Sequence, residues 1–421
     1  MFQFTLDFII NKIISPFSKM IAFARRNIAI TFLIGVLGIV SAKGASGQAF
    51  FALSQTFINP IPKEFDLFGG AIALSSNLIL ISAPNNDTGA IDSGAAYLFD
   101  ATTGRKLQTF SNPTPSNDDN FGWSVALSET RALISTGSDN TNAANSGAAY
   151  LFDTTTGNLL QTFLNPTPAE NDRFGSPVVL LANKALISAP LDDIKAQDSG
   201  AVYLFDISTS KLLQTFLNPS PEAGDAFGAS TALFGNFALI SAPSDNTSAK
   251  DSGAAYLFDI TTGKLLYTFL NPTPALGDRF GSSISLSGNF ALIGTWRDDT
   301  SAENSGAAYL FDTSTGKLLQ IFLNPTPEAS DQFGFSVALS ENLAFIGART
   351  DNIGALDSGA AYLFNITTGN LLQTFPNPNP GLGDFFGRSV VLSNNYALIS
   401  ADYDNAGARK SGAVYLFTAS K

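Results

Sequence analysis

Short apolar runs alternate with polar turns through residues 50–421. From Phe227 the chain reads Phe-Gly-Ala-Ser-Thr-Ala-Leu, then a turn at Gly235-Asn236, then Phe-Ala-Leu-Ile-Ser-Ala-Pro. A polar loop over 244–253 follows, then Ala-Ala-Tyr-Leu-Phe-Asp, a Thr-Thr-Gly turn and Leu-Leu-Tyr-Thr-Phe-Leu. Runs this short, bounded by Gly, Asn and Pro, predict four β-strands. No segment keeps a long 3.6-residue periodicity, which excludes solenoids built from helices.

The four-strand unit recurs every 53 residues without an insertion. Three motifs keep this step: Phe-Gly, Ser-Gly-Ala and Tyr-Leu-Phe, each present seven times. The Phe-Gly motifs begin at Phe68, Phe121, Phe174, Phe227, Phe280, Phe333 and Phe386. Four strands in a repeat of about 50 residues are typical of one propeller blade. The sequence therefore predicts an all-β, seven-bladed β-propeller over residues 50–421.

The two ends of the repeat array predict how the ring closes. The last unit stops at Tyr415-Leu416-Phe417 and lacks a fourth strand. Residues 53–60, Leu-Ser-Gln-Thr-Phe-Ile-Asn-Pro, match the fourth-strand segment 160–166 of another unit. We expect this N-terminal strand to complete the last blade and remove the exposed edges of an open array. An open solenoid is the alternative, but it leaves the offset unexplained.

Residues 1–49 carry the pattern of an export signal. Arg25-Arg26 precede an uncharged stretch over 28–40, and small residues follow it. Thirteen residues are too few to span a bilayer, which needs about 20, so a cleaved signal is expected rather than a retained anchor. The segment before it is long for a basic region, which indicates either an extended signal or translation from Met20. Export predicts a location in the periplasm, at the outer surface or outside a bacterium.

Composition excludes several kinds of catalytic centre. The chain has neither cysteine nor histidine, so it has no thiolate nucleophile, imidazole-based triad or cysteine-ligated metal.

The formal net charge is −12, which argues against nucleic-acid binding through charge. Without residues 1–49 the charge becomes −16. The predicted loops between second and third strands, together with the blade connections, carry 27 acidic and nine basic residues on one face. The rest of residues 50–421 carries seven acidic and nine basic residues, so the opposite face is nearly neutral.

Two polar columns repeat in every blade of that acidic face. Asp lies two residues before each Phe-Gly, and Asn precedes a proline at the start of each connection. We interpret both as side chains that hydrogen-bond backbone N–H groups in tight turns. The functional alternative is calcium, held by Asp-Asp or Asp-Asn pairs with loop carbonyls, because this hard cation prefers oxygen ligands. The metal candidates are Asp192, Asp193, Asp245, Asp298, Asp299 and Asp351.

The repeats resemble the FG-GAP repeats of the integrin alpha-chain propeller. They are still more similar to a bacterial branch with Phe-Gly-x-Ser-Val-Ala, a strand ending in Ala-Pro, and Ser-Gly-Ala-Ala-Tyr-Leu-Phe; here 121–126 and 187–190 carry that pattern. The resemblance covers residues 50–421 and implies a secreted or surface propeller that serves adhesion or ligand binding. Integrin-type repeats bind calcium through Asp-x-Asp-x-Asp-Gly in the first hairpin. Here that hairpin is a short turn such as Ser287-Gly288-Asn289, so the family's calcium sites do not carry over.

Singular residues are the remaining sign of function. Trp296, Arg297, Arg349, Arg388 and Tyr403 have no counterparts in the other blades and form a candidate recognition patch, with ordinary surface variation as the alternative. Thr315-Gly316-Lys317-Leu318-Leu319 resembles a quinoprotein dehydrogenase hairpin, but the regularly placed tryptophans of those blades are missing. A glycosidase with two carboxylates is the enzyme alternative, because its chemistry needs no histidine. Glu303 is the nearest singular acid, and no catalytic constellation is found. We expect a binding or adhesion scaffold that presents the acidic face to a cation or to a protein or glycan partner.

Overall fold

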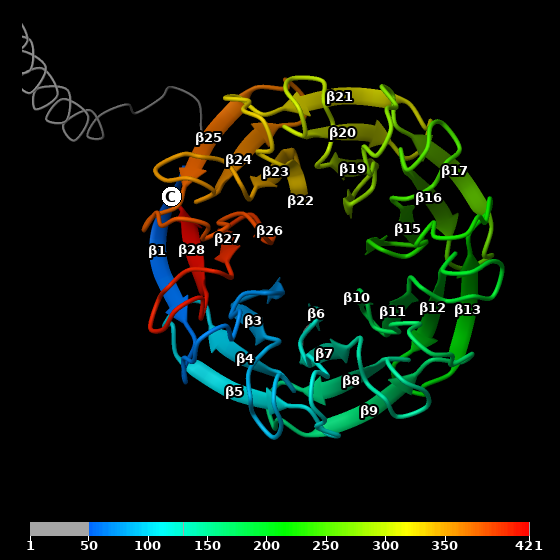
Figure 1. Cartoon of the computed structure of the whole chain (residues 1–421), viewed down its shortest axis with the longest axis vertical. Helices are drawn as coiled ribbons and strands as arrows, with labels where there is room; N and C mark the ends of the chain where they lie inside the picture. The colour runs from blue at the N-terminus through cyan, green and yellow to red at the C-terminus, as the bar shows by residue number, and fades with distance from the viewer. Residues whose placement is uncertain (1–49, 129, 421) are drawn as a thin grey trace, which may run out of the picture. The chain divides into compact units, whose positions relative to one another are not determined.

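The computed structural model describes residues 50–128 and 130–420. The predicted export signal lies outside these residues. The described chain forms seven four-stranded antiparallel sheets arranged as blades around one axis, which confirms the predicted propeller (Figure 1). No helix in the described ranges has the length and apolar character needed to cross a bilayer.

Each blade uses its strands in chain order from the axis outward, except the last. Blades 1 to 3 contain β2 (Ile72–Ser75), β3 (Leu78–Ala83), β4 (Ala95–Asp100), β5 (Lys106–Ser111); β6 (Val125–Ser128), β7 (Arg131–Thr136), β8 (Ala148–Asp153), β9 (Leu159–Leu164); and β10 (Val178–Leu181), β11 (Lys184–Ala189), β12 (Ala201–Asp206), β13 (Leu212–Leu217). Blades 4 and 5 contain β14 (Thr231–Phe234), β15 (Phe237–Ala242), β16 (Ala254–Asp259), β17 (Leu265–Leu270); and β18 (Ser283–Ser287), β19 (Phe290–Thr295), β20 (Ala307–Asp312), β21 (Leu318–Leu323). Blades 6 and 7 contain β22 (Phe333–Ser340), β23 (Leu343–Ala348), β24 (Ala360–Asn365), β25 (Leu371–Pro376); and β26 (Val390–Leu392), β27 (Tyr396–Ala401), β28 (Ala413–Ala419), β1 (Phe51–Ile58).

The N-terminal strand β1 closes the ring as predicted. It pairs antiparallel with β28, with Phe57 opposite Val414, and so supplies the fourth strand of blade 7. Phe57 is buried and its ring lies 5.1 Å from that of Phe99 in blade 1. Closure is therefore held both by a strand ladder and by packing against the next blade.

Phenylalanines hold neighbouring blades together. Phe110 on the outer strand of blade 1 packs against Phe152 of blade 2, with ring centroids 5.1 Å apart. Phe121, from the Phe-Gly motif, meets the same ring edge-on at 6.0 Å. Equivalent contacts recur around the ring, and buried aromatic pairs of this kind add to the hydrophobic stabilisation. The repeat thus explains why the chain has 36 phenylalanines.

The glycine of each Ser-Gly-Ala motif allows two blades to approach closely. Gly94 has φ +86°, and a Cβ there would lie 2.2 Å from the carbonyl oxygen of Phe121 in the next blade. Only glycine satisfies both conditions without strain.

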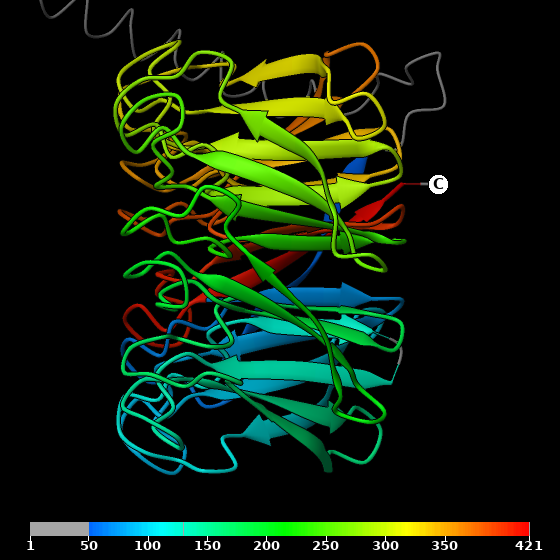
Figure 2. The same cartoon turned by 90° about the vertical axis from the view of Figure 1, so that its right-hand side faces the viewer.

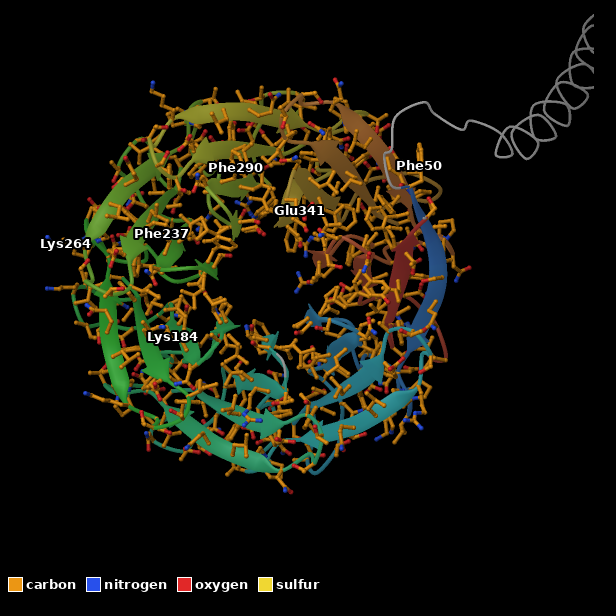
Figure 3. All side chains as sticks on the ribbon, turned by 180° about the vertical axis from the view of Figure 1, so that it is seen from behind. Phe50, Lys184, Phe237, Lys264, Phe290 and Glu341 are labelled. Atoms are coloured by element: carbon orange, nitrogen blue, oxygen red, sulfur yellow. The ribbon has the colours of Figure 1, made fainter. Side chains whose placement is uncertain are left out.

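The two faces of the ring carry different connections. The longer loops between the second and third strands lie with the blade connections on one face, which we call the loop face, and the short turns lie on the other (Figure 2). Figure 3 looks at the short-turn face, where Lys184, Phe237, Phe290 and Glu341 lie along one side of the central opening and Lys264 lies at the outer rim.

Candidate functional site

Each connection on the loop face is held by a buried Asn–Asp pair. In blade 2 the Asn112 Nδ2 donates to Asp119 Oδ2 at 2.7 Å, and the same oxygen accepts the backbone N–H of Ser116 at 2.6 Å. The pair recurs in every blade: Asn59–Asp66, Asn165–Asp172, Asn218–Asp225, Asn271–Asp278, Asn324–Asp331 and Asn377–Asp384. In each pair the aspartate accepts hydrogen bonds from the asparagine amide and from a backbone N–H of the turn, so the two side chains fix the turn, as the sequence indicated.

A second acid is buried beside six of these pairs. In blade 3 the hydroxyl of Tyr203 donates to Asp192 Oδ2 at 2.8 Å, and the backbone N–H of Ile194 donates to Asp192 Oδ1 at 2.9 Å. The tyrosine of the Tyr-Leu-Phe motif makes the same bond to Asp139, Asp245, Asp298, Asp351 and Asp404. Blade 1 differs, because Asn86 occupies this position.

Burial raises the pKa of the aspartate in the Asn–Asp pairs. Burial, together with the nearby carboxylates of Asp192 and Asp245, raises the pKa of Asp172 and of Asp225 to about 6. The same causes raise the pKa of Asp331 to about 7. Part of the loop face's negative charge therefore lies on buried carboxyl groups, so the formal charge overstates what a partner meets.

The six metal candidates fall into two groups. Asp192, Asp245, Asp298 and Asp351 are the buried acids that accept tyrosine hydroxyls. Asp193 and Asp299 are exposed, and each accepts a backbone N–H across its own loop, from Asp198 and Asn304. No group of three or more acidic side chains in 50–128 and 130–420 is placed to hold a metal ion. Calcium ligation stays a prediction. In the structure, each of these carboxylates accepts a hydrogen bond from a tyrosine hydroxyl or a backbone N–H.

The exposed acids form a rim on the same face. They include Glu64, Asp87, Asp118, Glu170, Asp193, Glu222, Asp299, Glu303 and Glu328. Glu222 and Glu328 accept amide hydrogens from Asn246 and Asn352 in the adjacent loops. Glu303 is one member of this exposed rim.

Inside the rim, two columns of residues do not repeat, and together they define what we call the mouth. The first column follows the second strand of each blade: Pro84, Gly137, Pro190, Pro243, Trp296, Arg349 and Asp402. The second follows each Phe-Gly: Gly70, Trp123, Ser176, Ala229, Ser282, Phe335 and Arg388. The Phe-Gly, Ser-Gly-Ala and Tyr-Leu-Phe motifs are nearly constant from blade to blade, whereas the residues of the mouth differ in size, polarity and charge.

The predicted recognition patch lies at the mouth over blades 5 to 7, joined by Phe335. The Arg349 guanidinium lies 3.8 Å from the centre of the Phe335 ring, and that of Arg388 lies 5.3 Å from it. Trp296 packs against Phe335 with ring centroids 6.2 Å apart. The Arg297 guanidinium lies 4.4 Å from the centre of the Trp296 ring. These distances match favourable cation–π geometry.

Tyr403 joins the patch from blade 7. Its ring lies 5.1 Å from that of Phe385, which is itself 5.6 Å from the Arg349 guanidinium, and Lys410 Nζ lies 4.7 Å from Tyr403. The structure therefore brings the five predicted patch residues into one network, which we call the arginine–aromatic cluster: Trp296, Arg297, Phe335, Arg349, Phe385, Arg388 and Tyr403.

One buried carboxylate anchors this cluster. Arg388 Nε lies 3.1 Å from Asp402 Oδ2, and Asp402 is 2% exposed. Burial raises the pKa of Asp402, although both arginines oppose the rise. Burial, with the charge of Arg388 beside it, lowers the pKa of Arg349 to about 10. Arg388 thus pairs with Asp402, while Arg349 Nε donates to Gln332 Oε1 at 2.6 Å, and the cluster keeps positive charge for an anionic group of a partner.

Sequence reasoning missed Phe335 and Asp402, which connect the cluster. It also missed a cleft at the mouth between blades 2 and 4, lined by Trp123, Arg173 and Ser176. A third cavity of about 410 Å³, between Asn77, Ser340 and Asn394, lies at the short-turn face. None of these three cavities, all among the described residues, has an Asp or Glu in its lining, and so they do not favour the glycosidase alternative.

The chain belongs to the FG-GAP repeat family. That family matches seven segments: 62–99, 113–152, 163–205, 215–258, 274–311, 325–364 and 379–417. The match supports the resemblance seen in the repeat motifs, and the propeller fold indicates a binding or scaffold role. No curated protein sequence matches the chain.

Proposed function

We propose that this protein is an exported binding or adhesion scaffold that contacts a protein or glycan partner through its loop face, without catalysis. The observation that carries the proposal is the arginine–aromatic cluster, because it departs from an otherwise regular repeat at neighbouring blades. Arginine and aromatic residues are enriched at the centres of binding surfaces. The closed ring and the buried Asn–Asp pairs supply a rigid support for them.

The charge distribution suggests how the partner is recognised. Arg349 and Arg388 stand beside a single buried carboxyl, that of Asp402, whose pKa burial raises, while exposed acids lie around the mouth. An isolated carboxylate or similar anion on the partner fits between the two guanidinium groups. A polyanion is opposed by the acidic rim. The partner is therefore expected to offer one anionic group on an otherwise neutral or basic surface.

The test is adhesion of the exported protein, produced from residues 1–421, to immobilised matrix proteins and to acidic and neutral polysaccharides. Replacing Arg349 and Arg388 together with Gln is expected to weaken binding to the preferred surface at least tenfold, because charge-assisted hydrogen bonds are lost. The matched control replaces Lys264 and Lys317, cations of the outer turns, with Gln and is expected to leave binding unchanged. Equal binding by the cluster variant and the wild type contradicts the proposed site.

Export is tested on the same preparation. The signal pattern of residues 1–49 predicts a protein in the periplasm, at the outer surface or in the medium, with its N-terminus at residue 40 or later. Cell fractionation and N-terminal mass spectrometry measure both. A mature protein that begins before residue 40 contradicts cleavage.

A further inference from the structure

A two-lobed cleft opens at the mouth between blades 2 and 4, and none of its lining residues belongs to the arginine–aromatic cluster. The larger lobe has a volume of about 320 Å³ and the smaller lobe about 100 Å³. Trp123, Arg173 and Ser176 line both lobes. A volume of about 300 Å³ is at the lower end of the range for pockets that hold small ligands.

The cleft exists because two mouth positions of these blades are unusual. Gly137 occupies a column that holds Pro, Trp, Arg or Asp in the other blades, and a Cβ there would lie 2.5 Å from Ser176 Oγ. Trp123 stands where most blades have a small residue, and its side chain supplies one wall. The opposite wall of the larger lobe is apolar and comes from Pro177, Pro190 and Leu191.

Three groups in the cleft lack a partner within the described chain. Trp123 is 50% exposed, which is unusual for so large an apolar side chain. The guanidinium of exposed Arg173 makes no hydrogen bond or ion pair with another described residue, although exposed acids are common on this face. Ser176 is 9% exposed, and its Oγ is buried without a hydrogen-bond partner. A buried hydroxyl in this state costs free energy that a ligand could recover.

We propose that this cleft binds a single carboxylate-bearing pyranose, such as a glucuronic acid residue at the end or branch of a glycan. The indole of Trp123 offers a flat apolar face for the C–H groups of the ring. Arg173 offers a two-pronged donor for the carboxylate. Ser176 lines both lobes, and its buried Oγ would turn to exchange a hydrogen bond with a ring hydroxyl.

The acidic rim favours a lone sugar acid over a polyuronate chain. Glu170 and Glu222 border the connections on either side of blade 3, where a polyanion would have to pass. A proline-rich peptide also suits an indole beside proline walls, but it leaves Arg173 and the buried Ser176 hydroxyl without partners. The proposal rests on the general binding function but uses none of the residues of the arginine–aromatic cluster.

Tryptophan fluorescence can report on this cleft alone, because the chain has only two tryptophans, Trp123 and Trp296. In a Trp296→Phe background, we expect methyl β-glucuronide to change the Trp123 emission saturably. Methyl β-glucoside is expected to bind about tenfold more weakly, because it cannot pair with Arg173.

Variants separate the roles of the three groups. Arg173→Gln is expected to remove the preference for glucuronide while it retains the weak glucoside binding. Trp123→Ala is expected to abolish binding of both sugars, measured by saturation-transfer NMR of the ligand, and Trp123→Phe to retain part of it. Lys264→Gln, at the rim of the short-turn face (Figure 3), is the unchanged control.

The outcomes that overturn the proposal are distinct. No saturable change with either sugar up to about 50 mM contradicts a sugar site, as does saturable binding of a proline-rich peptide alone. An unchanged glucuronide preference in Arg173→Gln contradicts the role of Arg173. These assays use neither Arg349 nor Arg388. A loss of sugar binding in the cleft and a loss of adhesion through the cluster are therefore independent results, and either proposal can be contradicted while the other is supported.

Discussion

The loop face contains a frame that repeats in every blade and a mouth that does not. In the frame, Asn324 donates a hydrogen bond to Asp331 and Tyr362 donates one to Asp351, and these residues have counterparts at the same places in nearly every blade. At the mouth, the column that holds proline in three blades holds Trp296, Arg349 and Asp402 in blades 5 to 7. Repetition marks positions selected for the ring itself. Departure from repetition marks positions that the ring does not need, and so indicates residues that serve a partner.

Removal of the closing strand is the change that should damage the frame most. Deletion of residues 50–60 leaves β28 as an exposed edge and removes the contact between Phe57 and Phe99. We expect the melting temperature, followed by circular dichroism, to fall by more than about 10 °C. An unchanged melt contradicts closure by β1. Deletion of Lys421 alone, which leaves the hydrogen bonds of Ser420 to Phe50 in place, is the control.

A single frame residue should have a smaller but clear effect. Asn165→Ala removes the buried amide that donates to Asp172 at 2.7 Å. The carboxylate then keeps only the backbone N–H of Ala169, and we expect a loss of about 1–3 kcal/mol in the free energy of unfolding. Denaturant titration measures this loss. A cost below about 0.5 kcal/mol would mean that the pair is not part of the frame.

The frame should make stability depend on pH. Asp172, Asp225 and Asp331 have raised pKa values, so the folded chain binds these protons more tightly than the unfolded chain does. Their contribution is complete below about pH 4 and is lost as the pH rises through about 6 to 7. Asp206 acts in the opposite sense: its turn hydrogen bonds lower its pKa to about 2, so its contribution is lost only as the pH falls toward 2. We expect a higher melting temperature at pH 5 than at pH 8.

Blade 1 supplies a matched variant for that pH effect. Asn86 stands there in place of the second acid, and its hydrogen bond lowers the pKa of Asp66, although burial still raises it overall. Asp351→Asn copies this arrangement beside Asp331 and is expected to reduce the fall in melting temperature between pH 5 and pH 8. Asn86→Asp should enlarge the fall. If both variants lose as much melting temperature between pH 5 and pH 8 as the wild type does, the paired acids are not the source of the fall.

Calcium should have the smallest effect. Asp192 and Asp298 are already hydrogen-bonded to tyrosine hydroxyls, so a bound ion has to displace protein contacts. We expect melting temperatures in millimolar calcium and in chelator to agree within about 1 °C, with no heat in a calorimetric titration. A saturable rise of several degrees would instead support the calcium sites predicted from the acid pairs.

The frame was predictable from the sequence because repetition exposes it. The match of residues 53–60 to 160–166 predicted ring closure, and the Asp and Asn columns predicted turn contacts. The mouth was predictable only in part. Trp296, Arg349 and Arg388 stood out as singular, but Phe335, which joins them, follows a Phe-Gly motif and resembles any other aromatic of a phenylalanine-rich chain. Arg173 and Ser176 gain meaning only once Gly137, from the neighbouring blade, is seen to open a cleft beside them.

The central claim is that the mouth of blades 5 to 7 serves a partner and the frame does not require it. It is tested most directly by a variant in which these blades carry the residues of blade 4 at the mouth. Pro243 is the template for the first column, which gives Trp296→Pro, Arg349→Pro and Asp402→Pro. Ala229 is the template for the second column, which gives Phe335→Ala and Arg388→Ala. Adhesion and melting temperature are measured together on this variant. We predict a melting temperature within a few degrees of the wild type and a loss of adhesion of at least tenfold. Retained adhesion, or a collapse of the fold, would contradict the account.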